Sequence, residues 1–146
     1  MTIKISPGLS NKLLDTGSLK ATMALGFLKI YSGAAPADAD AAVTGTLLCT
    51  ISLASSGTGI NFDAAAVAGV LAKAPAETWS GVNAATGRAG YFRHVAVGDT
   101  GASSTTQARI QGAVGVTGSD LNLTSVSLVS AATQTIDFYT VAMPLA

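Results

Sequence analysis

The chain has 146 residues, enough for one domain with a sizeable core, and its formal net charge is zero. Charged residues make up only 11% of it, against about 25% in an average soluble domain, so charge repulsion does little to keep copies apart. Its basic residues are scattered: Lys4, Lys12, Lys20, Lys29, Lys73, Arg88, Arg93 and Arg109. Nucleic-acid binding depends on clustered positive charge, so this distribution argues against such a partner. A surface rich in small residues instead favours packing against copies of itself or a larger assembly.

The first seven residues lack the long apolar run of a signal peptide. No window approaches the roughly 18 uninterrupted apolar residues of a membrane helix. We therefore expect a chain that is made and kept in a cytoplasm, or that leaves it only as part of an assembly, without membrane contact. The single cysteine, Cys49, excludes an internal disulfide and a cysteine-rich zinc site. Its position on the apolar face of a predicted strand indicates a buried structural thiol.

The N-terminal segment is predicted to be an extended or short-helical arm. Residues 2–6 alternate in polarity, as in a short edge strand. Residues 10–15 are expected to form one or two helical turns, with Ser10 as N-cap and with Leu13 and Leu14 facing inward. This is the only helix that we expect.

Two strands then follow, residues 24–31 and 46–53, joined by a loop of small residues (32–45). In the second strand the apolar side chains are expected on one face: Leu47, Cys49, Ile51 and Leu53, opposite Thr50 and Ser52. A period of two is typical of a half-buried strand with one face on a core.

Further strands are expected at a spacing of about 8–15 residues: 66–73 with a bulge at Gly69, 77–81, 88–97, 107–116, 121–128 with a bend near Thr124, and 133–143, closed by Pro144. The Ala-rich segment 66–73 also has helical propensity, but its central glycine favours a bulged strand.

Alternation also assigns faces to the later strands. In strand 88–97 one face carries Tyr91, Arg93, Val95 and Val97, and the other carries Phe92, His94 and Ala96. In strand 107–116 the inward residues are Ala108, Ile110, Val114 and Val116, and the outward residues are Gln107, Arg109 and Gln111. These elements predict an all-β fold: a single jelly-roll-like β-sandwich of about eight strands over residues 24–146, preceded by an arm over residues 1–23.

The most tempting chemical motif is Leu13-Leu14-Asp15-Thr16-Gly17-Ser18, echoed by Asp99-Thr100-Gly101-Ala102. It resembles the catalytic loop of aspartic proteases, in which two carboxylates share a proton. The chain is too short for a two-lobed protease, and it lacks the later apolar-apolar-Gly element of the half-size form at a suitable place. Asp-Thr-Gly is also ordinary turn chemistry, so we predict two turns and no enzyme.

The remaining candidates are weaker. Asp38 and Asp40 are spaced as calcium ligands sometimes are, but the other ligands of such a loop are missing, which indicates a solvated loop. His94 is the only histidine, so a hydrogen-bonded sheet residue is expected. Asn122-Leu123-Thr124 fits the N-glycosylation sequon, but without an export signal we do not expect Asn122 to be glycosylated. We predict no catalytic residue, no cofactor and no metal site.

Several motifs follow one another in a fixed order from about Ala24 onward. They are Leu28-Lys29-Ile30-Tyr31-Ser32-Gly33, Pro36-Ala37-Asp38-Ala39-Asp40, Gly45-Thr46-Leu47-Leu48, Glu77-Thr78-Trp79-Ser80-Gly81, Gly87 to Arg93, Gly98-Asp99-Thr100-Gly101, Arg109 to Gly115, Asp120-Leu121-Asn122-Leu123 and Gln134-Thr135-Ile136-Asp137. This order resembles small virion proteins of tailed bacteriophages, in which an L-x-I-Y-[ST]-G strand precedes P-x-x-A-D and G-T-L-L. The resemblance implies a structural component of the virion.

A compact sheet domain with low charge and many small side chains can pack repeatedly over a symmetric shell. Each copy then buries a modest area, and repetition raises the overall avidity. The leading expectation is a capsid decoration (cement) protein, a homo-oligomer that binds the major capsid protein in a virion assembled in the host bacterial cytoplasm. Its expected contacts are residues 1–18 and 33–43, which have too little local structure to be ordered alone.

Two alternatives remain open. The chain could instead be a tail, collar or fibre-base component. It could also be a carbohydrate-binding module that stacks sugars on Trp79, Tyr91 or Tyr139, although apolar rings are more often core residues.

Overall fold

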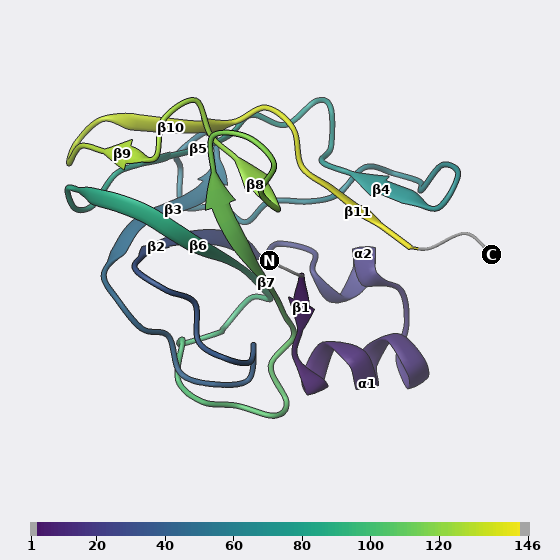
Figure 1. Cartoon of the computed structure of the whole chain (residues 1–146). Coiled ribbons are helices and arrows are strands. Elements are labelled where there is room, and N and C mark those ends of the chain that lie inside the picture. Colours follow the sequence, from purple (N-terminus) through teal and green to yellow (C-terminus); the bar gives the residue numbers. More distant parts are fainter. Residues whose placement is uncertain (1–2, 144–146) are drawn as a thin grey trace.

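The structure is a computed structural model that describes residues 3–143, so Thr2 and Pro144, which bounded two predicted elements, lie outside it. Its elements are β1 (Lys4–Ile5), α1 (Pro7–Asp15), α2 (Leu19–Thr22), β2 (Phe27–Ser32), β3 (Leu47–Leu53), β4 (Val70–Ala72), β5 (Trp79–Val82), β6 (Gly87–Val95), β7 (Arg109–Gly115), β8 (Leu121–Asn122), β9 (Ser127–Leu128), β10 (Thr133–Ile136) and β11 (Thr140–Ala142). Strands dominate, so the predicted all-β class is confirmed (Figure 1).

Nine strands form one sheet, in the order β1-β7-β6-β2-β3-β5-β10, with β8 beside β7 and β9 beside β6. The pairs are antiparallel except β7–β8, which is parallel. Strands β4 and β11 form a second, two-stranded sheet. Figure 1 shows β5 and β10 stacked above β2 and β6, so the large sheet curves over on itself. The single-domain, sandwich-like fold is therefore as predicted.

The core lies between these layers and is rich in aromatic rings. Phe62, Trp79, His94 and Tyr139 form a cluster with ring centroids 5.3–6.3 Å apart. Leucine and isoleucine side chains that are less than 2% exposed surround it: Leu28, Ile30, Leu48, Ile51, Ile60 and Ile110. In β2, Leu28 and Ile30 are buried and alternate with the partly exposed Phe27 and Lys29, as a period of two requires, whereas Tyr31 is also buried.

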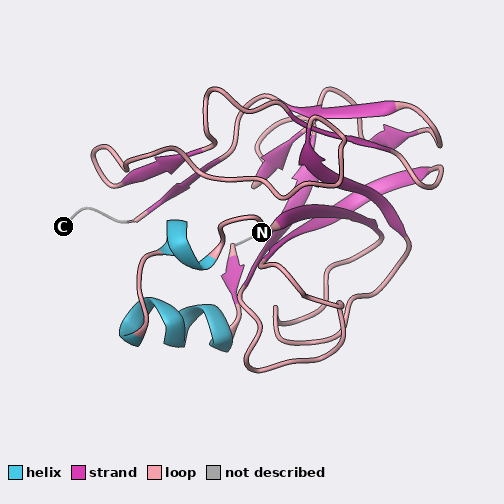
Figure 2. Ribbon diagram, turned by 180° about the vertical axis from the view of Figure 1, so that it is seen from behind, coloured by secondary structure: helices cyan, strands magenta, loops and turns pink. Residues whose placement is uncertain are grey.

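The helical part differs from the prediction in its start, its number of helices and its buried face. Helix α1 begins after Ser6, whose Oγ accepts a hydrogen bond from the Leu9 N–H at 3.2 Å, so Ser6 and not Ser10 is the N-cap. Leu9 is fully buried, whereas Leu14 is 84% exposed, so the prediction for Leu14 was wrong. A second short helix, α2, was not expected. Figure 2 shows both helices packed together at one end of the molecule.

The predicted alternation in β3 is interrupted by a bulge. Ile30 of β2 is opposite Cys49, but its neighbour Tyr31 is opposite Leu47, so Leu48 is the extra residue in the ladder. Leu48 and Cys49 are therefore both fully buried, and Leu47 is only partly buried.

Three predicted strands are shorter than expected. The segment 121–128 is divided into β8 and β9, which pair with β7 and β6 respectively. In segment 66–73 a tight turn joins Val67 to Val70, with Ala68 and Gly69 at φ 50° and 77°, so only β4 is extended. The predicted strand 133–143 is divided, because β10 pairs with β5 whereas β11 pairs with β4. The chain crosses between the two sheets at residues 137–139.

Candidate assembly surface and buried polar network

Two loops, residues 33–46 and 96–108, lie together below β2 and β6 in Figure 1. Backbone hydrogen bonds join them: the Val43 N–H donates to the Gly101 carbonyl at 2.9 Å, and the Ser104 N–H donates to the Asp40 carbonyl at 2.8 Å. These loops cover the face of β6 and β7 that carries their polar side chains, so that face is not open to solvent.

Arg109 is the centre of the covered face. The sequence predicted it outward, but it is fully buried. Its Nε and Nη2 donate to the two carboxylate oxygens of Asp99 at 2.5 and 3.0 Å, and its Nη1 donates to the carbonyls of Ala39 and Asp40. This two-pronged geometry neutralises the buried charge and ties both loops to β7.

A row of side chains continues this network across the sheet. Gln111, also predicted outward, is 1% exposed, and its Nε2 donates to the Pro36 carbonyl at 2.9 Å. Arg93 donates from Nε to Gln111 Oε1 at 2.8 Å, and burial lowers its pKa. The Tyr91 hydroxyl donates to the Thr44 carbonyl at 2.6 Å and accepts from the Thr44 N–H at 3.0 Å. The loop 33–43, expected to be a contact segment with too little local structure to be ordered alone, is thus held in place by side chains of its own sheet.

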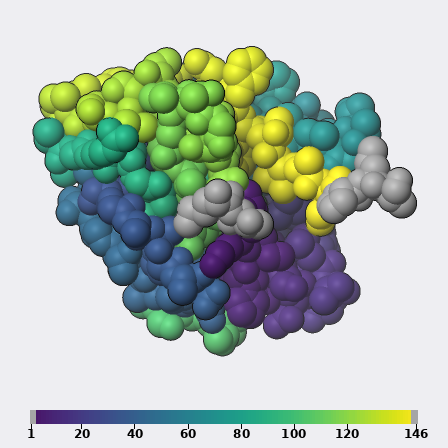
Figure 3. Space-filling model, in the orientation of Figure 1, coloured from purple at the N-terminus to yellow at the C-terminus, as the bar shows by residue number. Residues whose placement is uncertain are grey.

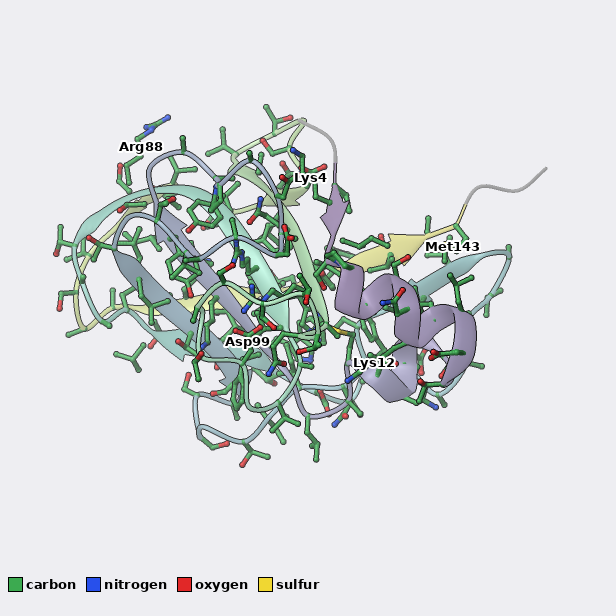
Figure 4. All side chains as sticks on the ribbon, turned by 90° about the horizontal axis from the view of Figure 1, so that it is seen from below. Lys4, Lys12, Arg88, Asp99 and Met143 are labelled. Atoms are coloured by element: carbon green, nitrogen blue, oxygen red, sulfur yellow. The ribbon has the colours of Figure 1, made fainter. Side chains whose placement is uncertain are left out.

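The two Asp-Thr-Gly motifs lie in separate turns. Asp99 Oδ1 accepts a hydrogen bond from the Gly101 N–H at 2.6 Å, which is the geometry of an Asx turn. Asp15 is the last residue of α1 and is exposed, and its Oδ1 accepts a hydrogen bond from the hydroxyl of its neighbour Thr16. Each carboxylate is engaged locally, and the arrangement provides no pair that shares a proton. Figure 4 shows Asp99 among the side chains of the two covering loops.

His94 is a core residue. It is 1% exposed, and its Nδ1 lies 3.2 Å from the Tyr139 hydroxyl. Burial lowers its pKa to about 3, so the imidazole is neutral at physiological pH. Burial likewise raises the pKa of Cys49 to about 11, which keeps the thiol protonated.

The aromatic residues considered for sugar stacking are inside the fold. Trp79 and Tyr91 are fully buried, and Tyr139 is 6% exposed. The Trp79 indole donates to Glu77 Oε2 at 2.8 Å, which satisfies its one polar atom. None of the three presents a ring face to solvent.

The small β4–β11 sheet projects beyond the large sheet on the right of Figure 1. We call it the β4–β11 arm (residues 64–72 and 140–143), as distinct from the predicted N-terminal arm, and it carries exposed apolar side chains. Val67 is 73% exposed and Met143 is 58% exposed. A pocket of about 300 Å³ lies between the β4–β11 arm and α2, lined mainly by apolar groups of Leu19, Leu71, Val141 and Met143. Figure 3 shows the C-terminal strand, in yellow, next to the purple N-terminal helices at this site.

Phe138 is the most exposed large apolar residue described, at 89%. It lies between β10 and β11, beside a groove of about 490 Å³ whose polar lining includes Asp120, Asn122 and Asp137. Alternation in an unbroken strand 133–143 did not single out this residue. Its exposure follows from the crossing between sheets.

Residues 3–143 contain no helix long and apolar enough to cross a membrane. The same described part of the chain holds no group of three or more His, Cys, Asp or Glu placed to bind a metal ion. Comparison with protein-family models, with curated proteins and with solved structures finds no match to this chain.

Proposed function

We propose that this chain is a structural protein of a tailed-bacteriophage virion, and specifically a capsid decoration (cement) protein that binds the major capsid protein and copies of itself. The observation that carries the proposal is the presence of exposed apolar features at two sites: the β4–β11 arm with its pocket, and Phe138 beside a separate groove. Large exposed apolar features on a soluble domain typically mark interaction sites. The resemblance of the motif order to small virion proteins supplies the setting.

The polar groups support the same proposal. Asp99, His94 and Cys49 are the side chains best suited to catalysis by their chemistry, and all three are buried. Asp99 is paired with Arg109, His94 stays neutral, and the Cys49 thiol stays protonated. The surface that remains is weakly charged and carries isolated apolar projections. Such a surface stabilises contacts by burial of apolar area, and repetition around a symmetric shell multiplies a weak contact.

Purified particles of the phage that encodes the chain provide the test. A decoration protein would be present in hundreds of copies and would appear on the outer surface of the head by cryo-electron microscopy. A copy number of a dozen or fewer, or density confined to a collar, tail or fibre base, would refute the decoration role.

A further inference from the structure

Phe138 projects from the fold with its ring in solvent. Asp137 and Thr140 near it are also exposed, whereas Tyr139 is buried in the core. Phe138 thus lies on the solvent side of the segment that joins β10 to β11. An aromatic ring so exposed on the segment between two strands has the form of an anchor that inserts into a partner's pocket.

The pocket between the β4–β11 arm and α2 has the matching size and chemistry. Its volume of about 300 Å³ exceeds the roughly 150 Å³ that is enough to bind benzene in an apolar cavity. Leu71 and Val141 contribute to its apolar lining, and Lys20 lies at its edge, with Nζ donating to the Ala64 carbonyl at 2.8 Å. A phenyl ring would fit in the pocket without leaving a buried polar group unpaired.

The Phe138 ring does not occupy the pocket of its own chain. Val141 and Met143 line that pocket, whereas Phe138 is not among its lining residues and its side chain is 89% exposed. The occupant therefore comes from another molecule.

Charge identifies a second copy as that molecule. Asp137, next to Phe138, is exposed, and Asp120 and Asp137 line the groove beside Phe138, which has no Lys or Arg in its described lining. Lys20 lines the pocket between the β4–β11 arm and α2, and no Asp or Glu is among the described residues of that lining. The two sites of one molecule are thus opposite in charge.

We infer that Phe138 of one copy docks into the pocket between the β4–β11 arm and α2 of the next copy, with Asp137 beside Lys20. The two surfaces differ, so the contact is head-to-tail and repeats from copy to copy into a ring or a chain. A single ring in a pocket is a small interface, and each contact is weak until it is repeated. This inference specifies the self-association within the proposed function and rests on that function only for its biological setting.

Sedimentation velocity of the purified chain over a rising concentration series tests the contact. Wild type is expected to self-associate, and Phe138→Ala to weaken association about tenfold or more. Leu14→Ala is the matched control, because Leu14 is equally exposed but lies on α1 outside both surfaces. Circular dichroism of each variant verifies that it is folded.

A charge exchange tests the register of the contact. Asp137→Lys alone is expected to weaken association, and Asp137→Lys combined with Lys20→Asp to restore it. A wild type that stays monomeric throughout, a Phe138→Ala variant that associates like wild type, or a double variant without restoration would overturn the inference. These outcomes are independent of the copy number in particles, so failure of the contact and failure of the decoration role are distinguishable.

Discussion

Asp99 and Arg109 form a buried two-pronged ion pair, with both side chains 1% exposed, that joins the loop after β6 to the first residue of β7. The same guanidinium donates to backbone carbonyls of the loop 33–46. One side chain therefore holds two loops that are far apart in sequence. Because Arg109 is buried, water cannot solvate its charge if Asp99 is removed, so the stability of the fold depends strongly on this pair.

Asp99→Ala is expected to lower the free energy of unfolding by about 3–5 kcal/mol, because it leaves the Arg109 charge buried and uncompensated. Urea unfolding followed by circular dichroism measures this. Asp15→Ala is the control, since it removes the same residue from the other, exposed Asp-Thr-Gly and should change stability by less than about 0.5 kcal/mol. Equal stability of the two variants would contradict the role of the pair.

Tyr91→Phe is expected to loosen the loop 33–46. The lost hydroxyl makes two hydrogen bonds with the backbone of Thr44, and its removal should cost about 1 kcal/mol. Hydrogen exchange at Thr44 and its neighbours should become faster. Tyr31→Phe is the control. The Tyr31 ring is stacked on Tyr91 with centroids 5.1 Å apart, but the Tyr31 hydroxyl makes no such hydrogen bond within residues 3–143. Similar exchange in both variants would show that the Tyr91 hydroxyl does not hold the loop.

Gly90→Ala is expected to destabilise the fold by about 1–3 kcal/mol, as overpacking does. A Cβ atom at position 90 would collide with the carbonyl oxygen of Gly33, where the covering loop starts. Gly17→Ala is the control, because a Cβ atom there meets open space and the backbone has no positive φ. Thermal unfolding of the two variants measures the difference, and a Gly90→Ala protein as stable as wild type would mean that the loop does not pass so close.

His94 is expected to make the protein less stable in mild acid. Its folded pKa of about 3 lies below the ordinary value near 6.5, so the unfolded chain binds the proton first as pH falls. The free energy of unfolding should therefore decrease by about 1.4 kcal/mol per pH unit between pH 6 and 4 on account of this residue. The pH slope of His94→Phe should be shallower than that of wild type by this amount.

The histidine can also be followed directly in the wild-type protein. Its ring NMR signals should remain those of a neutral imidazole from pH 8 to pH 4. A midpoint near pH 6 would show that the ring is open to water and would remove the basis for the stability prediction.

Local pattern alone was sufficient for several features. The alternation in strand 107–116 correctly predicted Ala108, Ile110 and Val114 as inward residues, because strand geometry sends every second side chain to the same face. Val116, also predicted inward, instead lies beyond β7 and is 57% exposed. The turn at Asp99 was also predicted, because the Asx turn depends only on a side chain and the backbone two residues on. The all-β class follows from such local preferences added along the chain.

Tertiary structure decided what covers each face. Arg109 and Gln111 were expected in solvent, but a loop about 70 residues earlier in the chain folds over them and supplies carbonyl acceptors. The exposure of Phe138 likewise depends on a change of partner, since β10 joins one sheet and β11 another. Alternation tells which side chains share a face, whereas only the packing of distant segments determines whether that face meets protein or water.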